Sequence, residues 1–542
     1  MTRHRGNSTP FSPILPPAFA PKGTAAVTHI QTQPPAAPAK PAPRDPRFYV
    51  TCAIMLLMVL ASMEQTITAT VMPSIIGALH GVEHYAWVPA VYLLAATVTM
   101  PLYGRLADAI GRKRVITAAV CLFAGGSLLA ALSQNIYQLI LFRGIQGLGA
   151  GGIMPIVLTI LGDIYTLKER AKIQGYFSAL WGTASVAGPI VGSILLGTLG
   201  WRSIFWVNLP FGLLGLIVLI YYYKDTGHRH KGDLDITGGL TLALGSAALL
   251  IFATGIGTPD RNWLVVSIAL AIGLTLTIGF FLHERRIAHP IMPPTLLLHP
   301  RIGPSLLANL VMGVIVFGIE IYAPLYVQGG RGGSAWDSAA TVTPVMLGWA
   351  ISSLVAARMM VKWGFRRSAM IGGTIMFCGT TGLFLAALFR LPLPFLIATL
   401  ALTGLGCGPT AFAYLLGAQD AVEYKQRGVV TSLVTFTRTL GGALGVGAVG
   451  SLLNFIMRTD MQFLLSHNIP VAKLLDRQAG PDKYQVPPEF LARSQEMIAS
   501  GTVWVFATLA ALTIVQFLFS TRISSHHQSP AAVPPVDAIE AA

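Results

Sequence analysis

Long apolar segments recur along the whole chain, and they constrain its fold more than any other feature. A helix needs about 20 mostly apolar residues to cross the hydrocarbon core of a bilayer, and it satisfies its own backbone hydrogen bonds there. Fourteen segments meet this requirement. Their approximate bounds are 49–71, 86–106, 115–133, 137–160, 173–197, 203–223, 236–256, 263–283, 303–328, 340–361, 368–389, 393–416, 429–455 and 501–521. The sequence therefore predicts an all-α membrane protein with fourteen transmembrane helices.

The composition supports this prediction. Of the 542 residues, 53% are hydrophobic and 11% are charged, whereas ordinary soluble domains contain about 25% charged residues. The net charge is +15, but the basic residues stand in short loops between apolar segments. We therefore expect the lipid bilayer, and no nucleic acid, as the large partner. Cys52, Cys121, Cys378 and Cys407 fall within apolar segments and show no metal-site or disulfide pattern.

The distribution of Lys and Arg predicts the orientation. With the N-terminus inside, the inner segments hold 26 of the 37 basic residues and the outer segments hold nine, five of them in the loop 456–499. Arg143 and Arg438 fall inside predicted helices. This asymmetry satisfies the positive-inside rule with both termini cytoplasmic. It predicts a multi-pass protein of the cytoplasmic (inner) membrane.

A weak internal repeat predicts two halves. The basic stretch 104–114 follows the second apolar segment, and a degenerate echo, 358–367, follows the tenth. Glu64 in the first segment matches Glu320 in the ninth. Parallel halves around a site near the bilayer midplane are typical of secondary transporters. The predicted organisation is a disordered cytoplasmic tail at 1–47, a six-helix half at 48–223, an inserted helix pair at 236–283, a second six-helix half at 301–521 and a cytoplasmic tail at 522–542.

The basic stretch carries a specific spacing, Gly104-x3-Asp108-x2-Gly111-Arg112. Its glycines permit a tight turn, Asp108 can cap or pair across helix ends, and the basic residues mark the cytoplasmic face. This spacing resembles the signature loop of the major facilitator superfamily, and the resemblance implies a gating role for these four residues. The alternative is a basic loop that only sets the orientation.

Two further motifs narrow the resemblance. The segment Leu141–Gly151, which contains Arg143, resembles the fourth-helix motif of the superfamily. The pattern Gly182-x5-Gly188-Pro189-x2-Gly192 resembles the motif of its antiporters. The small residues permit close helix packing, and the proline permits a bend. From about residue 48 to 522 the chain is similar to the fourteen-helix drug:proton antiporter branch (EmrB/QacA type). This implies the major facilitator fold, with two six-helix halves plus two inserted helices.

Glu64 and Glu320 are carboxylates in apolar segments, where a charge facing lipid costs roughly 2.5–3.5 kcal/mol. Both lie at similar depth, with Glu64 about 22 Å into its helix at 1.5 Å per residue, so both can face one central cavity. A carboxyl group there is neutral when occluded and ionised when hydrated, which suits a proton carrier or a partner for a lipophilic cation. The branch usually has Asp where this chain has Glu64.

Arg143 is a third candidate for the proton-coupling and substrate site, because a nearby guanidinium changes the protonation of a carboxyl group. The alternative is structural: Glu64 pairs with Arg143 or with backbone groups to hold the bundle together. Arg438 has the same two interpretations. Asp163, which precedes Lys168 and Arg170, is interpreted as a cytoplasmic cap or a gate partner.

The resemblance implies proton-coupled efflux (drug:H+ antiport) of lipophilic compounds, cations above all, by alternating access. Protons and small lipophilic substrates would be the ligands. No ATP-binding loop, catalytic set or metal cluster stands in the sequence, so we expect no enzyme activity and no cofactor, with the proton gradient as the energy source. Alternatives are a dedicated exporter of one metabolite (a siderophore, antibiotic or lipid) and a non-transporting sensor or scaffold. The loop 456–499 is either an amphipathic hairpin or a contact for a periplasmic adaptor.

Overall fold

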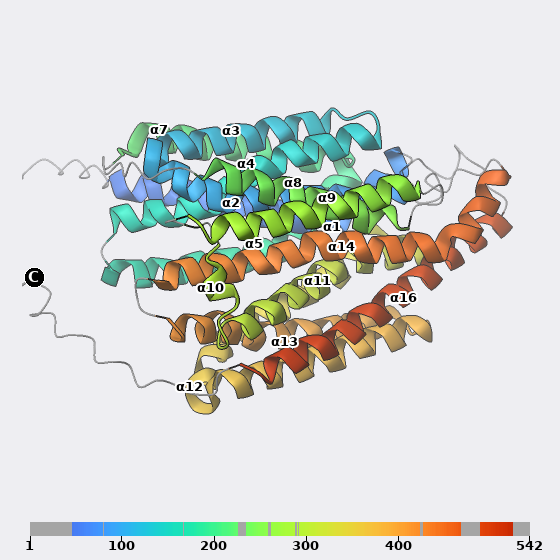
Figure 1. Cartoon of the computed structure of the whole chain (residues 1–542). Coiled ribbons are helices and arrows are strands. Elements are labelled where there is room, and N and C mark those ends of the chain that lie inside the picture. The colour runs from blue at the N-terminus through green and yellow to red at the C-terminus, as the bar shows by residue number, and fades with distance from the viewer. Residues whose placement is uncertain are drawn as a thin grey trace, which may run out of the picture. The chain divides into compact units, whose positions relative to one another are not determined.

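The structure is a computed structural model, and it describes residues 46–523 except 80, 166, 226–234, 258–261, 288–289, 291, 423–425 and 468–487. The predicted tails, 1–47 and 522–542, lie almost wholly outside the described residues. The described residues fold into helices joined by short connections (Figure 1). Fourteen of the helical segments are long and apolar enough to cross a membrane, which confirms the predicted number.

The described part of the first half contains α1 (Pro46–Leu79), the 3-10 turn η1 (Val82–His84), α2 (Trp87–Ile110), α3 (Arg112–Ala131), α4 (Ile136–Ile164), α5 (Leu167–Leu199), the short α6 (Ser203–Trp206) and α7 (Asn208–Tyr222). The insert begins with α8 (Ile236–Gly255). α1 packs against α4, α5 and α7, while α4 packs between α2 and α3.

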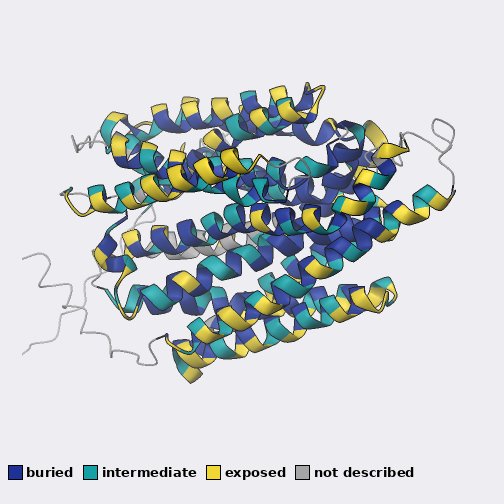
Figure 2. Cartoon of the chain, turned by 45° about the vertical axis from the view of Figure 1, so that its right-hand side comes forward, coloured by how far each residue is buried: buried dark blue, intermediate teal, exposed yellow. Residues whose placement is uncertain are grey.

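The remaining elements complete the insert and form the second half. They are α9 (Trp263–Glu284), α10 (Pro294–Leu297), α11 (Gly303–Leu325), the π-helical turn η2 (Tyr326–Gly330), α12 (Ala335–Leu388), α13 (Leu393–Asp420), α14 (Arg427–Ser466) and α16 (Pro488–Ser520). The halves meet where α1 contacts α11, α2 contacts α14 and α5 contacts α12. α8 packs on both α2 and α14, so the inserted pair contacts both halves. α9 presents a long exposed apolar face, as a lipid-facing helix does (Figure 2).

The tenth and eleventh predicted helices are both present within α12 as two membrane spans, Ala335–Ala356 and Arg358–Leu388, and the non-helical φ of +76° at Gly364 marks the kink of this element. One expected boundary needs correction. The outer loop expected at 456–499 is shorter, because α14 continues to Ser466 and α16 begins at Pro488. Arg493 of α16 donates to Asp460 of α14 at 2.8 Å. The two charged residues therefore pair between the helices, and both helices extend past the predicted ends.

Local capping explains several helix starts. Asn135 accepts a hydrogen bond from the Gln138 amide at 2.9 Å at the start of α4. Ser334 and Asp337 form a reciprocal capping box at the start of α12. Asp235 accepts from the Gly238 amide at 2.8 Å before α8. Each of these side chains satisfies an amide that has no partner inside its own helix.

Candidate functional site

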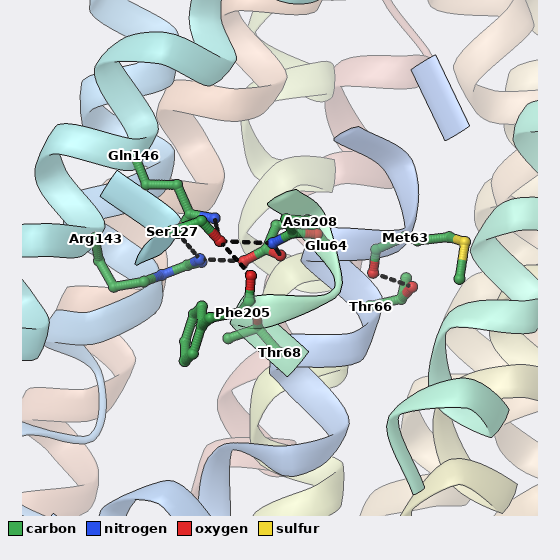
Figure 3. Close-up of polar contacts among 9 residues, drawn as sticks. All are labelled: Met63, Glu64, Thr66, Thr68, Ser127, Arg143, Gln146, Phe205 and Asn208. Atoms are coloured by element: carbon green, nitrogen blue, oxygen red, sulfur yellow. Dashed lines mark hydrogen bonds and ion pairs between the residues drawn. The ribbon is translucent and has the colours of Figure 1, made fainter. Parts of the chain in front are cut away.

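Glu64 lies at the centre of a buried polar network in the first half (Figure 3). Its side chain is fully buried. Oε1 accepts hydrogen bonds from Arg143 Nη1 at 2.5 Å and from Thr68 Oγ1 at 3.1 Å. Oε2 accepts from the amide of Asn208. These donors offset the cost of burying a carboxylate in the membrane, so the structural alternative considered for Glu64, a pair with Arg143, is present in the fold.

Arg143 connects this network to an aromatic wall. Besides Glu64, its Nη1 donates to Gln146 Oε1 at 2.6 Å. The guanidinium carbon lies 4.1 Å from the centroid of the Tyr92 ring and 5.8 Å from that of Phe205. A desolvated cation over such a ring is stabilised by the quadrupole of the ring. The Nε of Arg143 is buried without a hydrogen-bond partner among the described residues.

Three polar residues complete the network, and the sequence did not single them out for this role. The amide of Asn208 on α7 donates to Ser127 Oγ at 2.8 Å, and Gln146 Nε2 reaches the same oxygen at 3.3 Å. Ser127 in turn donates to the carbonyl of Phe205 at 3.0 Å. The available signal was weak: Asn208 and Ser127 are polar side chains within apolar segments, and Gln146 follows Arg143 by three residues. The network therefore fastens α1, α3, α4 and α7 together.

A small cavity of about 20 Å³ lies between the halves, which is room for about one water molecule. Glu320 on α11 lines it from the second half, and Arg143 lines it from the first. The other lining residues are Gln65, Thr68, Ala69, Met72, Pro89, Tyr92, Leu93, Phe317 and Ile321. The cavity thus brings α1, α2 and α4 together with α11.

Glu320 differs from Glu64 in its surroundings. It is 5% exposed, and the described residues give its carboxylate neither a hydrogen bond nor an ion pair. Glu64 is not among the residues that line the cavity. The expectation that both carboxylates face one cavity therefore holds for Glu320 alone. Thr68, one turn after Glu64 on the same face of α1, lines the cavity. The Glu64 carboxylate does not, because it bonds Thr68 itself, Arg143 of α4 and Asn208 of α7.

Arg438 on α14 has no ion pair comparable to that of Arg143 with Glu64 among the described residues. Its guanidinium carbon lies 5.5 Å from the Trp349 ring centroid, and the described residues give it no carboxylate partner.

Among the described residues, no group of three or more His, Cys, Asp or Glu side chains is placed to hold a metal ion.

The signature loop contacts the ends of two other helices. Gly111 has φ of +101°, and a Cβ there would lie 2.3 Å from Asp225 Oδ2, so only glycine fits the turn between α2 and α3. The Arg112 amide donates to Asp225 Oδ1 at 3.3 Å. The Arg112 side chain forms an ion pair with Asp163 at 3.3 Å, so Asp163 pairs with the signature loop.

Tyr223 contributes a further contact to this cluster. Its hydroxyl donates to Asp163 Oδ2 at 3.1 Å. Burial, together with the Asp163 carboxylate, raises the pKa of Tyr223 well above its ordinary value, so the phenol stays a donor. The loop therefore ties α3, α4 and the end of α7 together.

The other two signature residues differ from Gly111. A Cβ on Gly104 would meet no atom within 4 Å, so packing does not require glycine at that position. The side chain of Asp108 lies outside the described residues. In the second half, Gly364 has φ of +76° at the bend of α12. The degenerate echo thus keeps the glycine turn of Gly111 although most of the motif has been lost.

The glycines of the antiporter motif place α5 against α1. A Cβ on Gly188 would lie 1.9 Å from Thr66 Oγ1, and one on Gly192 would lie 3.3 Å from Ile67. Gly182 is less constrained, since its Cβ would meet Ala350 of α12 at 3.5 Å. Pro189 lies inside α5, and its carbonyl accepts from Ser193 Oγ at 2.9 Å. Gly188 therefore packs beside the turn of α1 that carries Glu64.

Comparison with known proteins decides the family. Residues 54–446 match the sequence profile of the Major Facilitator Superfamily. The chain belongs to this superfamily. It is 31% identical over 421 residues to the multidrug transporter protein MdtP of Bacillus subtilis (strain 168), covering 77% of each chain. It is 29% identical over 500 residues to multidrug resistance protein 3 of the same organism, covering 88% of this chain and 96% of that protein.

Solved structures agree on the major facilitator fold. A bacterial homologue of the human lysosomal transporter Spinster, in an inward-facing and unoccupied conformation, aligns with a TM-score of 0.65 at 17% identity. The alignment covers 90% of this chain and 100% of that one. The protein is thus a multi-pass membrane transporter of the superfamily, and the motifs that carried the resemblance stand at its interhelical contacts.

Proposed function

We propose that this transporter exports lipophilic compounds, cations above all, in exchange for protons. The names of its relatives, a multidrug transporter and a multidrug resistance protein, support the choice of substrates. In this proposal both termini lie in the cytoplasm, the protein lies in the cytoplasmic membrane, and the proton gradient drives transport without a cofactor. The observation that carries the proposal is the Glu320 carboxyl group, which lines a cavity between the halves and has no hydrogen-bond or ion-pair partner among the described residues.

Proton and substrate compete for Glu320 in this mechanism. A carboxylate without a partner is costly in a dry cavity, so it accepts either a proton or a cationic substrate. Binding of one displaces the other, which is the requirement for exchange. Phe317 also lines the cavity, and its ring can stack with a planar cation once the halves separate, because the closed cavity has room for about one water molecule.

Glu64 and Arg143 have a supporting part in this proposal. The pair holds the Arg143 guanidinium at the cavity wall. Glu64 itself is occupied by its three donors. We therefore assign the exchanged proton to Glu320 and the positioning of Arg143 to Glu64.

Alternating access requires contacts between the halves that can open. Such hydrogen bonds gather at the end of the bundle opposite the signature loop. Tyr85 Oη donates to the Ile321 carbonyl at 2.8 Å, and Asn454 Nδ2 donates to the Glu83 carbonyl at 2.9 Å. Gln328 bonds α1 at the same end. In the predicted orientation this is the outer side, so these contacts would close the outer gate.

The test is dye-driven proton movement in energised inside-out vesicles. Ethidium should release protons from vesicles with the wild-type protein and not from those with Glu320→Gln. Glu489→Gln, which alters an exposed carboxyl group in the first turn of α16, serves as the matched control and should behave as wild type. Proton release that persists in Glu320→Gln and disappears in Glu64→Gln would move the coupling site to Glu64. No release in correctly inserted wild type would reject ethidium:proton exchange and favour a dedicated exporter.

A further inference from the structure

A second hollow lies apart from the cavity between the halves. It is a groove of about 310 Å³ between the end of α12 and residues 496–504 of α16. Its lining residues are Phe384, Ala387, Leu388, Arg390, Glu496, Ala499, Ser500, Val503 and Trp504. None of these residues lines the cavity that contains Glu320. The groove therefore needs an explanation of its own.

The groove is polar at one end and apolar along its length. Arg390 Nη2 donates to the Glu496 carboxylate at the polar end. Trp504 lies eight residues after Glu496 on α16, or about 12 Å along the helix at 1.5 Å per residue. Leu388, Val503 and Trp504 supply apolar walls between these levels. A charged rim above an aromatic and aliphatic floor matches the boundary between lipid headgroups and acyl chains.

The position of Arg390 is held by its surroundings. It is the one non-glycine residue with positive φ in the described chain, at +52°. Such a conformation costs free energy and persists where neighbouring contacts hold it. Here the adjoining Leu391 accepts from Arg331 Nη1 at 2.6 Å through its carbonyl and donates from its amide to the Ala386 carbonyl at 2.9 Å. The loop thus fixes the backbone from which the Arg390 side chain reaches the rim of the groove.

We propose that this groove binds one phosphatidylethanolamine molecule of the outer leaflet, as the predicted orientation places it. The phosphate binds the Arg390 guanidinium, the ammonium binds the Glu496 carboxylate, and an acyl chain lies along Leu388, Val503 and Trp504. The side chains of Arg390 and Glu496 are 61% and 57% exposed, so their mutual pair is weak and costs little to open. Each charge then exchanges one partner for another.

The charge pair selects among the common phospholipids. An ethanolamine headgroup carries both a phosphate and an ammonium that donates hydrogen bonds, so it satisfies both protein charges. A choline headgroup has no N–H to donate to Glu496. A phosphatidylglycerol headgroup has no cation, and it places its phosphate beside the Glu496 carboxylate. The site therefore prefers phosphatidylethanolamine over both.

The test is lipid retention by the purified full-length protein, measured by native mass spectrometry after incubation with mixed phospholipids. Wild type should retain phosphatidylethanolamine over phosphatidylcholine by roughly tenfold, the value of one charge-assisted hydrogen bond. Arg390→Ala should lose this preference, and Glu496→Gln should shift retention toward phosphatidylglycerol. The matched control is Arg493→Ala, which lies on α16 outside the groove and breaks an exposed pair with Asp460 of α14. This variant should keep the preference.

Several results would overturn the proposal. One is equal retention of the two lipids by wild type, and another is an unchanged preference in Arg390→Ala. If that variant fails to fold, Leu388→Trp, which narrows the apolar wall, should reduce retention at an unchanged melting temperature. Displacement of the lipid by ethidium at transport concentrations would assign the groove to substrate instead. None of these results bears on proton exchange at Glu320.

Discussion

Arg143 Nη1 lies 2.5 Å from Glu64 Oε1, and the same guanidinium forms part of the wall of the cavity that Glu320 lines. The repeat in the sequence makes Glu64 and Glu320 equivalent, but the fold does not. The first carboxylate has three side-chain donors, while the second has no partner among the described residues. This asymmetry separates a structural ion pair from an acid that is available to a ligand.

The first prediction concerns the stability of this ion pair. Replacing one partner of a buried pair leaves the other charge uncompensated, which costs about 3–5 kcal/mol. Glu64→Gln and Arg143→Gln should each lower the melting temperature of the purified protein, and the double variant should recover part of the loss. Glu320→Gln should leave the melting temperature unchanged or raise it, because it removes a buried carboxyl group that no side chain satisfies. Additive losses in the double variant would show that the two residues are not coupled.

A second prediction separates the glycines of the antiporter motif. Gly188→Ala would place a Cβ 1.9 Å from Thr66 Oγ1. α5 must then move away from α1, at a cost of about 1–3 kcal/mol for overpacking. Gly182→Ala meets Ala350 at an ordinary 3.5 Å and should be tolerated. Melting temperature and ethidium efflux should both fall for Gly188→Ala only, and Thr66→Ala should restore part of the loss. Equal tolerance of both alanines would contradict the packing explanation.

The number of helices could be predicted from sequence because length and apolarity are local properties. The hydrogen-bond partners of Glu64 could not be predicted from such local properties. Arg143 lies 79 residues away and Asn208 lies 144 residues away, and only packing decides which face of α1 meets which helix. Pairing between Glu64 and Arg143 was one of two interpretations, whereas Asn208 and Ser127 gave no distinct signal.

Helix ends were less predictable where charges find partners. Charged residues after 455 suggested a loop, but Arg493 pairs with Asp460 and α14 continues to Ser466. The echo loop at 358–367 had lost most of its motif, and still Gly364 keeps the positive φ of Gly111. The two loops therefore share a backbone turn at one glycine, and this likeness is not visible when only their side chains are compared.

A third prediction is the pH dependence contributed by Asp235 at the start of α8. Burial acts to raise the pKa of its carboxyl group, but the hydrogen bond from the Gly238 amide, together with the hydrogen bond and the charge of His283, outweighs it and lowers the pKa. Stability from a lowered carboxyl pKa is present above the ordinary value, about 3.9, and is lost as the pH falls through the lower one.

The measurement compares wild type with Asp235→Asn, which retains an N-cap side chain. Wild type should melt at a higher temperature at pH 6, and the difference should shrink below about pH 4. Asp235→Ala should be less stable still, by about 0.5–2 kcal/mol for the lost cap. A difference between wild type and Asp235→Asn that stays constant down to pH 3 would mean that the carboxylate charge has no part in it.

The last prediction concerns Gln328, which lies in the π-helical turn η2 and joins the halves. Its Nε2 donates to the Thr70 carbonyl at 3.0 Å, and its Oε1 accepts from Ser74 Oγ at 3.2 Å. Both partners belong to α1. Its bond to Ser338 Oγ, at 2.7 Å, stays within the second half. π-helical turns are rare and often occur at functional positions, and here the turn places one amide side chain between α1 and α12.

Gln328→Leu removes both bonds to α1, each worth about 0.5–1.5 kcal/mol net. The loss should shift the equilibrium toward outward-open by roughly five- to hundredfold. A cysteine at Met72, which lines the cavity, reports this shift as faster labelling by an impermeant maleimide added outside, in a background without the four native cysteines. Ser74→Ala should give a smaller increase, because it removes one bond between the halves. Ser338→Ala is the matched control, since it removes a Gln328 bond within one half, and its labelling rate should equal that of wild type. If Ser338→Ala accelerates labelling as much as Ser74→Ala, Gln328 only stabilises η2 locally, and the outer gate is closed by other contacts.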